Sequence, residues 1–149
     1  RLSFGGDVPV VPPDLSAASR LTSLAFHWLQ PDNLAATVSM LQQASTRLRK
    51  LELSLGEFHQ REQQASIAAG LGPTLGRFPW LTELATEGTP FLPHLGSLRS
   101  LCTLKLQRVS AADLSIDDAD YLAGLRLEEL SFGRSMPSGA QRDRRLQVR

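Results

Sequence analysis

Leucines in this chain recur with an unusual spacing. The stretch LRSLCTLKL, residues 98–106, has leucine at 98, 101, 104 and 106, so the steps are three, three and two. An amphipathic helix alternates steps of three and four, and a half-buried strand steps by two throughout. The last two leucines therefore lie on one face of a short strand. The leucine three residues earlier enters the core from the turn that leads into that strand.

The same three-position spacing occurs five times along the chain. Its first two positions are leucine in every copy, and the third is apolar in four of the five. The copies are LTSLAF from Leu21, LRKLEL from Leu48, LTELAT from Leu81, LCTLKL from Leu101 and LEELSF from Leu127. Strands stacked in parallel would bury the middle leucines in one row, which no single copy could bury alone. These middle leucines are Leu24, Leu51, Leu84, Leu104 and Leu130.

Successive copies start 27, 33, 20 and 26 residues apart. Three of these intervals fall in the roughly 20–29-residue period of leucine-rich repeats. The chain therefore resembles the leucine-rich-repeat family, of the intracellular type, over residues 20–135. The resemblance implies an α/β solenoid with a short curved parallel sheet on its concave side and helices or turns on its convex side. Two features depart from the family. The Asn or Cys expected eight residues after the first leucine is missing from every copy, and the last copy can also be framed on Leu122, Leu125 and Leu127.

The segments between the copies predict helices behind the strands. Residues 31–41, PDNLAATVSML, begin with helix-start residues and then place apolar side chains on one helical face. A second helix is predicted from about residue 60 to 69, ended by Gly70 and Gly72 with Pro73 behind them.

The later connections are shorter or better capped. Pro90 and Pro93 follow the third copy and allow only a turn or an abbreviated helix. In the fourth connection, Ser115 and Asp118 form a helix-start signal for a helix through Leu122.

The two ends differ from the middle. Residues 1–19 are rich in proline and glycine and are interpreted as an arm or linker, and the basic residues 136–149 as a disordered tail. Residues 20–135 are then a leucine-rich-repeat domain of about five repeats. Solenoids need polar capping repeats to stay soluble, and neither end resembles one. We therefore expect the chain to be a fragment of a longer array.

Composition limits the partners and the cellular compartment that we expect for the protein. The formal net charge of +1 predicts no bulk attraction to nucleic acid or membrane. A single cysteine, Cys102, cannot form an internal disulfide and favours a reducing compartment, so we expect a cytoplasmic or nuclear protein. No apolar run reaches the roughly 18 residues of a membrane span. Arginines in the tail are interpreted as a solvated terminus, and nucleic acid is not expected as a partner.

Candidate chemical motifs have simpler explanations. GLGPTLG at residues 70–76 lacks the strand before it and the Lys-Ser or Lys-Thr after it that a phosphate-binding loop needs, so helix termination is favoured. Acidic residues at a helix start explain the cluster near residue 117 without calcium. That cluster comprises Asp113, Asp117, Asp118 and Asp120.

Neither the histidines nor the cysteine form a recognisable catalytic or metal-binding set. His27, His59 and His94 lie on different copies, and Cys102 has no histidine in its own copy. We expect no catalytic residue, no metal, no cofactor and no small-molecule substrate.

The residues that alternate with the buried leucines are expected to face outward on the concave side. That surface is polar and mixed in sign, with Lys50 beside Glu83 and with Trp28 and Leu55 as an apolar pair at one end. The residues expected to bind a partner are Trp28, Lys50, Glu52, Glu83, Glu87, Lys105, Gln107, Arg108, Glu129 and Arg134.

The function expected from this surface is that of a non-catalytic scaffold that binds a protein partner through the concave sheet. The alternative is the substrate-receptor arm, of the F-box type, of a ubiquitin ligase. That alternative depends on the resemblance alone, because no F-box-like helical segment is visible. A third class is an enzyme or regulator whose site lies in a region outside this chain.

Overall fold

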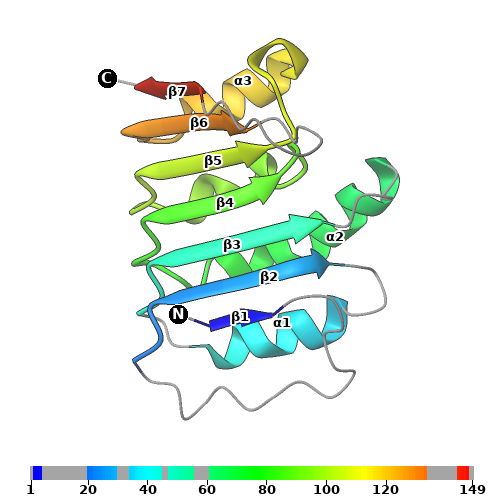
Figure 1. The fold of residues 1–149 in the computed structure, drawn as a ribbon, viewed down its shortest axis with the longest axis vertical. Coiled ribbons are helices and arrows are strands. Elements are labelled where there is room, and N and C mark those ends of the chain that lie inside the picture. Colours follow the sequence, from blue (N-terminus) through cyan, green and yellow to red (C-terminus); the bar gives the residue numbers. More distant parts are fainter. Residues whose placement is uncertain are drawn as a thin grey trace, which may run out of the picture.

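The protein is an α/β molecule built on one sheet. The computed structural model describes residues 2–4, 20–29, 34–44, 47–55, 61–133 and 144–147. Its seven strands are hydrogen-bonded in chain order, β1 to β7 (Figure 1). Strands β1 to β6 pair in parallel and β7 pairs antiparallel with β6. The strands are β1 Leu2–Phe4, β2 Ser23–Leu29, β3 Lys50–Leu55, β4 Glu83–Glu87, β5 Thr103–Gln107, β6 Glu129–Gly133 and β7 Arg144–Gln147.

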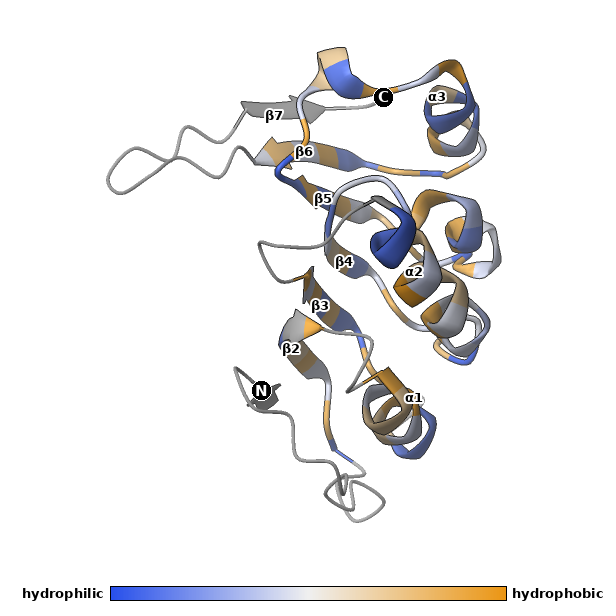
Figure 2. Cartoon of the chain, turned by 90° about the vertical axis from the view of Figure 1, so that its right-hand side faces the viewer, coloured by the Kyte–Doolittle hydropathy of each residue, from blue (hydrophilic) through white to orange (hydrophobic). Residues whose placement is uncertain are grey.

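Helices cover one face of this sheet. They are α1 Leu34–Gln43, α2 Arg61–Leu75, the 3₁₀ helices η2 Leu92–Ser97 and η3 Ala111–Asp113, and α3 Ile116–Ala123. Figure 2 shows α1, α2 and α3 on the same side of the strands, and within the described ranges no helix lies on the opposite side. The described helices include none that is long and apolar enough to cross a membrane.

The predicted row of buried leucines is confirmed. Leu24 pairs with Leu51, which pairs with Leu84, and the row continues through Leu104 to Leu130. The first four are fully buried, and Leu130 is 8% exposed. The pairing of Leu104 with Leu130 also settles the frame of the last copy in favour of the one that starts at Leu127.

A backbone pattern holds the N-terminal ends of these strands together. The carbonyl of Thr22 accepts the N–H groups of both Arg49 and Lys50, at 2.8 and 3.0 Å. The same arrangement recurs at the next three junctions, again within 2.8–3.0 Å. Its acceptors there are the carbonyls of Arg49, Thr82 and Cys102. Every pair of neighbouring copies is therefore joined at the same backbone position, which fixes the register of the leucine row.

Two of the predicted connections are confirmed. Residues after the third copy form only the short helix η2. Ser115 is the N-cap of α3, where its hydroxyl accepts the Asp118 N–H at 3.1 Å and the Asp118 carboxylate accepts the Ser115 N–H at 3.0 Å.

The predicted end of the second helix is wrong. Helix α2 continues through Gly70, Gly72 and Pro73 and ends at Leu75. These glycines serve close packing: a Cβ at Gly72 would lie within 2.9 Å of the Cβ of His94 in η2, and one at Gly70 within 2.9 Å of Leu34 Cδ2 in α1. The absent side chains let α2 approach both neighbouring helices, and this contact outweighs the weak helix propensity of glycine.

The ends of the chain also differ from the prediction. Residues 2–4, assigned to an arm, form β1 beside β2, and residues 144–147, assigned to a disordered tail, form β7 beside β6. Neither segment carries the leucine spacing, so the sequence pattern gave no strand to either. The remaining residues of 1–19 and 136–149 lie outside the described ranges.

Candidate functional site

The face of the sheet opposite the helices carries the residues expected to bind a partner. We call it the open face, defined by three rows of side chains that run across β2 to β6. The first row is Ser23, Lys50, Glu83, Thr103 and Glu129. The second row is Ala25, Glu52, Ala85, Lys105 and Ser131. The third row comprises Ser54, Glu87, Gln107 and Gly133.

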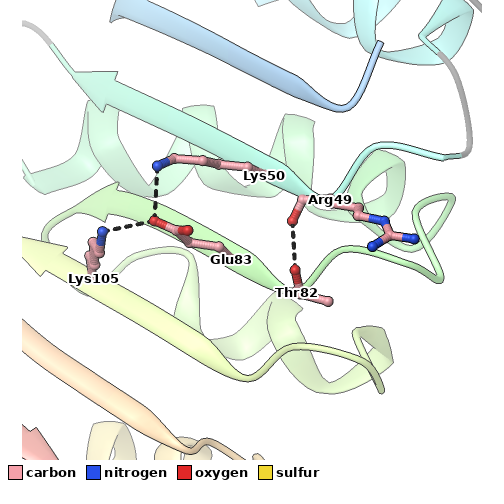
Figure 3. Close-up of polar contacts among 5 residues, drawn as sticks. All are labelled: Arg49, Lys50, Thr82, Glu83 and Lys105. Atoms are coloured by element: carbon pink, nitrogen blue, oxygen red, sulfur yellow. Dashed lines mark hydrogen bonds and ion pairs between the residues drawn. The ribbon is translucent and has the colours of Figure 1, made fainter. Parts of the chain in front are cut away.

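The predicted pairing of Lys50 with Glu83 is confirmed and is part of a larger group (Figure 3). Glu83 Oε1 lies 3.1 Å from Lys50 Nζ and 2.8 Å from Lys105 Nζ. Lys105 stands diagonally across from Glu83, because the residue directly opposite Glu83 is Thr103. Diagonal neighbours on one face are within reach of long side chains, and that geometry is the signal by which this third member could have been found.

The charge on Glu83 is stabilised in the folded protein. Partial burial acts to raise the pKa of Glu83, but hydrogen bonds and charge attraction from Lys105 and Lys50 outweigh burial, so the pKa lies below its ordinary value. The group is half-exposed, with 26% of the Glu83 side chain and about 40% of each lysine side chain open to solvent (41% for Lys50 and 38% for Lys105). It therefore fixes the position of both ammonium groups while leaving them accessible to a partner.

Glu87 has a structural role that the sequence did not reveal. The residue is 7% exposed. Oε1 accepts a hydrogen bond from the Ser54 hydroxyl at 2.6 Å, and Oε2 accepts the backbone N–H of Leu55 at 3.0 Å. Regular pairing between β3 and β4 stops at Leu53 opposite Thr86. The Glu87 side chain thus extends the β3–β4 connection beyond the last backbone pair, and it is the least accessible of the described candidates.

Leu55, expected to form an apolar pair with Trp28 on the open face, lies in the core instead. Pairing between β2 and β3 shifts after Phe26, so that Leu29 rather than Trp28 stands opposite Leu55. Leu29 and Leu55 are 0% and 2% exposed and belong to the core. The extra residue in β2 turns both leucines inward, as a β-bulge does. Trp28 lies at this irregularity, and its side chain falls outside the described part of the structure.

Arg108 occupies a strained position at the C-terminal end of β5. Its φ is 58°, in the left-handed region that residues other than glycine seldom adopt. Its backbone N–H donates to the carbonyl of Gly133, and its Nε lies 3.9 Å from Glu87 Oε1. The ion pair places the guanidinium of Arg108, whose side chain is 33% exposed, beside the third row of the open face.

The remaining candidates fall into two groups. Glu52, Gln107 and Glu129 are half-buried on the open face, where the sequence placed them. Arg134 lies outside the described residues.

Several motifs set aside in the sequence have structural explanations. Residues 70–75 belong to α2, so the GLGPTLG segment forms no phosphate-binding loop. Asp113 and Asp118 complete capping boxes with Ser110 and Ser115. Cys102 donates a hydrogen bond from its thiol to the Ser100 carbonyl at 3.2 Å. Over the described ranges, no three His, Cys, Asp or Glu side chains are grouped closely enough to hold a metal ion.

The chain matches no protein-family model, no curated protein and no solved structure.

Proposed function

We propose that this chain is a leucine-rich-repeat module that acts as a non-catalytic scaffold and binds a protein partner through the open face. The proposal is supported by two regularities. The middle leucines of the five copies form one buried row, and one backbone carbonyl joins each pair of neighbouring copies. Repetition of this kind builds an extended surface from short units, and stacked repeats use such surfaces for binding.

The observation that carries the proposal is the contrast between the two faces of the sheet. Helices cover the leucine face, and no described helix covers the open face (Figure 2). Small side chains alternate with long charged ones on the open face: Ala85 lies between Glu52 and Lys105, and Ser131 lies on the other side of Lys105. A partner segment can therefore approach the backbone at some positions and exchange charged contacts at others.

The lysines of the open face are suited to recognition because they are already positioned. Binding immobilises long side chains, at about 0.5–1.5 kcal/mol for each. Glu83 holds the ammonium groups of Lys50 and Lys105 before any partner arrives, so a partner carboxylate would meet them at a smaller loss of entropy. Polar contacts on a preorganised surface favour selectivity over raw affinity.

The test compares one chemical change on the two sides of the molecule. Glu52→Arg reverses a charge on the open face, and Glu62→Arg reverses a charge on α2, on the covered side. Affinity capture followed by mass spectrometry should recover partners with the intact protein and with Glu62→Arg, but lose them with Glu52→Arg. Circular dichroism of both variants checks that the fold is retained.

Recovery of the same partners with both variants would place binding elsewhere and contradict the proposal. Recovery of no protein in stoichiometric amount by the intact chain would also contradict it.

A further inference from the structure

A second surface of the molecule carries a row of arginines. Each of the five turns that lead into β2 to β6 contains at least one exposed arginine. These residues are Arg20 before β2, Arg47 and Arg49 before β3, Arg77 before β4, Arg99 before β5 and Arg126 before β6. Parallel strands all begin at the same edge, so the turns line one edge of the sheet, on the left in Figure 1. We call this surface the arginine edge.

Stabilisation of helix ends does not explain the arginine edge. Cations favour the last turn of a helix, where they interact with the macrodipole, and the effect is confined to that turn. None of α1, α2 and α3 has a basic residue in its last turn. Arg77 does have a structural contact, because its guanidinium donates to the Gln42 carbonyl at the end of α1. Arg77 is therefore not among the arginines available to a ligand.

The charges are separated along the strand direction. Within the described parts of the five turns, Glu128 is the one carboxylate. Other carboxylates lie at and beyond the C-terminal ends of the strands, at Glu87, Asp113 and Asp118, whereas those that begin β4 and β6, Glu83 and Glu129, belong to the open face. The net charge of +1 averages over both regions and conceals this separation. A strongly basic edge attracts polyanions even on a nearly neutral protein.

An exposed tryptophan stands in the middle of the arginine edge. Trp80 lies in the turn before β4, and it is 63% exposed. The other large apolar side chains exposed in the described residues are Ile116 and Tyr121, both on α3. Arg49 precedes the strand on one side of Trp80, and Arg99 precedes the strand on the other. Figure 3 shows the Arg49 side chain extending away from the Lys50, Glu83 and Lys105 group, beyond the start of its strand.

A pocket lies farther along the same edge, between the turns before β5 and β6. Its volume is about 290 Å³. Two arginines contribute to its lining, together with small and aliphatic residues. The lining residues are Gly96, Leu98, Arg99, Gly124, Leu125 and Arg126. Apart from its chain neighbours, no atom lies within 4 Å of where a Cβ on Gly96 would stand, so the pocket is open on the Gly96 side.

We propose that the arginine edge binds single-stranded nucleic acid. Phosphates pair with the arginines, one of them at the pocket between Arg99 and Arg126, and a base stacks on Trp80. Basic rows with an aromatic stacking platform are the common solution for binding single strands. Five strands at about 4.8 Å spacing make the edge about 19 Å long, enough for roughly four nucleotides.

A single strand fits this edge better than a protein does. Stable protein interfaces have an apolar core that becomes fully buried, surrounded by a polar rim. The arginine edge offers Trp80 as its one large exposed apolar side chain, surrounded by guanidinium groups. A base needs only the indole face, and its phosphates need only the arginines.

Binding is measured by fluorescence anisotropy with a labelled 12-nucleotide thymidine strand and the full chain. We expect micromolar affinity at low salt. The logarithm of the binding constant, plotted against the logarithm of the salt concentration, should fall with a slope of about −2 to −3, because about four phosphate contacts contribute roughly −0.7 each. Trp80→Ala should weaken binding by about tenfold or more through lost stacking. Arg126→Gln should weaken binding about fivefold and reduce the slope by about 0.7.

Matched controls separate the edge from general charge and from unfolding. Tyr121→Ala removes an exposed aromatic residue on α3, and Arg61→Gln removes one positive charge at the start of α2, away from both the arginine edge and the open face. Both should bind within about twofold of the intact protein. Thermal melting followed by circular dichroism verifies that all four variants are folded.

Three results would overturn the proposal. One is the absence of binding to the thymidine strand at low salt, and another is unchanged affinity in folded Trp80→Ala. The third is tighter binding of a 12-residue glutamate peptide or of phosphatidylserine vesicles than of the thymidine strand. The edge would then be a site for acidic protein or lipid. None of these results bears on the open face, which the variants leave intact.

Discussion

The two faces of the sheet obey different rules although they share the same strands. On the helix-covered face, one residue type fills a row from Leu24 to Leu130, and each member is almost completely buried. On the open face, the neighbouring row mixes Lys50, Glu83 and Thr103, and its members are half-buried. Buried positions require apolar side chains of matched size, whereas solvent-exposed positions accept side chains of many types. The covered face therefore determines the stability of the molecule, and the open face is available for recognition.

Glu87 is the exception that sharpens this contrast. It projects from the open side of the third row, yet it is as buried as the core and uses both carboxylate oxygens in hydrogen bonds. Part of the open face is thus structural, at the C-terminal ends of the strands. The accessible part lies nearer to Lys50 and Lys105.

The largest expected effect comes from the leucine row. Leu104→Ala should lower the free energy of unfolding by about 2–5 kcal/mol, because Leu104 is fully buried and a cavity would remain. Its neighbour Lys105→Ala, on the open face, should change stability by no more than about 1 kcal/mol, through a half-exposed ion pair. Urea denaturation of both variants measures the difference. Equal losses would mean that the two faces have been assigned wrongly.

An intermediate effect is expected at Glu87. Glu87→Ala should lower the free energy of unfolding by about 1–3 kcal/mol, because it leaves the buried Leu55 N–H without its acceptor. Glu52→Ala is the matched control, since it removes a carboxylate from the same face without such a buried contact. It should change the free energy of unfolding by no more than about 0.5 kcal/mol. Chemical denaturation distinguishes the two. A loss at Glu87 no greater than that at Glu52 would contradict its structural role.

A smaller effect, of opposite sign, is expected at Thr86. Its hydroxyl is the one buried side-chain polar atom among the described residues without a hydrogen-bond partner, and it replaces an apolar residue in the row of Leu53 and Leu106. Thr86→Val keeps the shape and removes the unpaired hydroxyl, so it should stabilise the protein by about 1 kcal/mol. A rise in the melting temperature checks this. A fall would show that the hydroxyl makes a contact in solution.

The smallest effect is a dependence on pH. Because folding lowers the pKa of Glu83, its contribution is fully present above the pKa of the unfolded glutamate and is lost as the pH falls through the folded value. The contribution should be about 0.2–1 kcal/mol, as for other exposed ion pairs. The stability difference between the intact protein and Glu83→Gln, measured from pH 7 into the acid range, should shrink on acidification. A difference that is constant with pH would rule out this ion-pair group.

Sequence alone determined the helix-covered face of the sheet. The leucine spacing recurs five times, and the two-residue period of a strand allows only one register that keeps every leucine inside. The N-cap of α3 was equally predictable, because Ser115 and Asp118 contact each other across three residues of chain. Local chemistry and strict periodicity are the features that a sequence displays directly.

Only the tertiary structure decided the rest. Helix α2 continues through Gly70 and Gly72 because Leu34 and His94 pack against them, and neither contact is local in sequence. The carboxylate of Glu87 turns back to β3, 32 residues away along the chain. The arginine edge arises in the same way. Parallel stacking brings together turns that are some 20–30 residues apart. Arg20, Arg47 and Arg126 each directly precede the first leucine of a copy, but only the stacking of the strands places them on one surface.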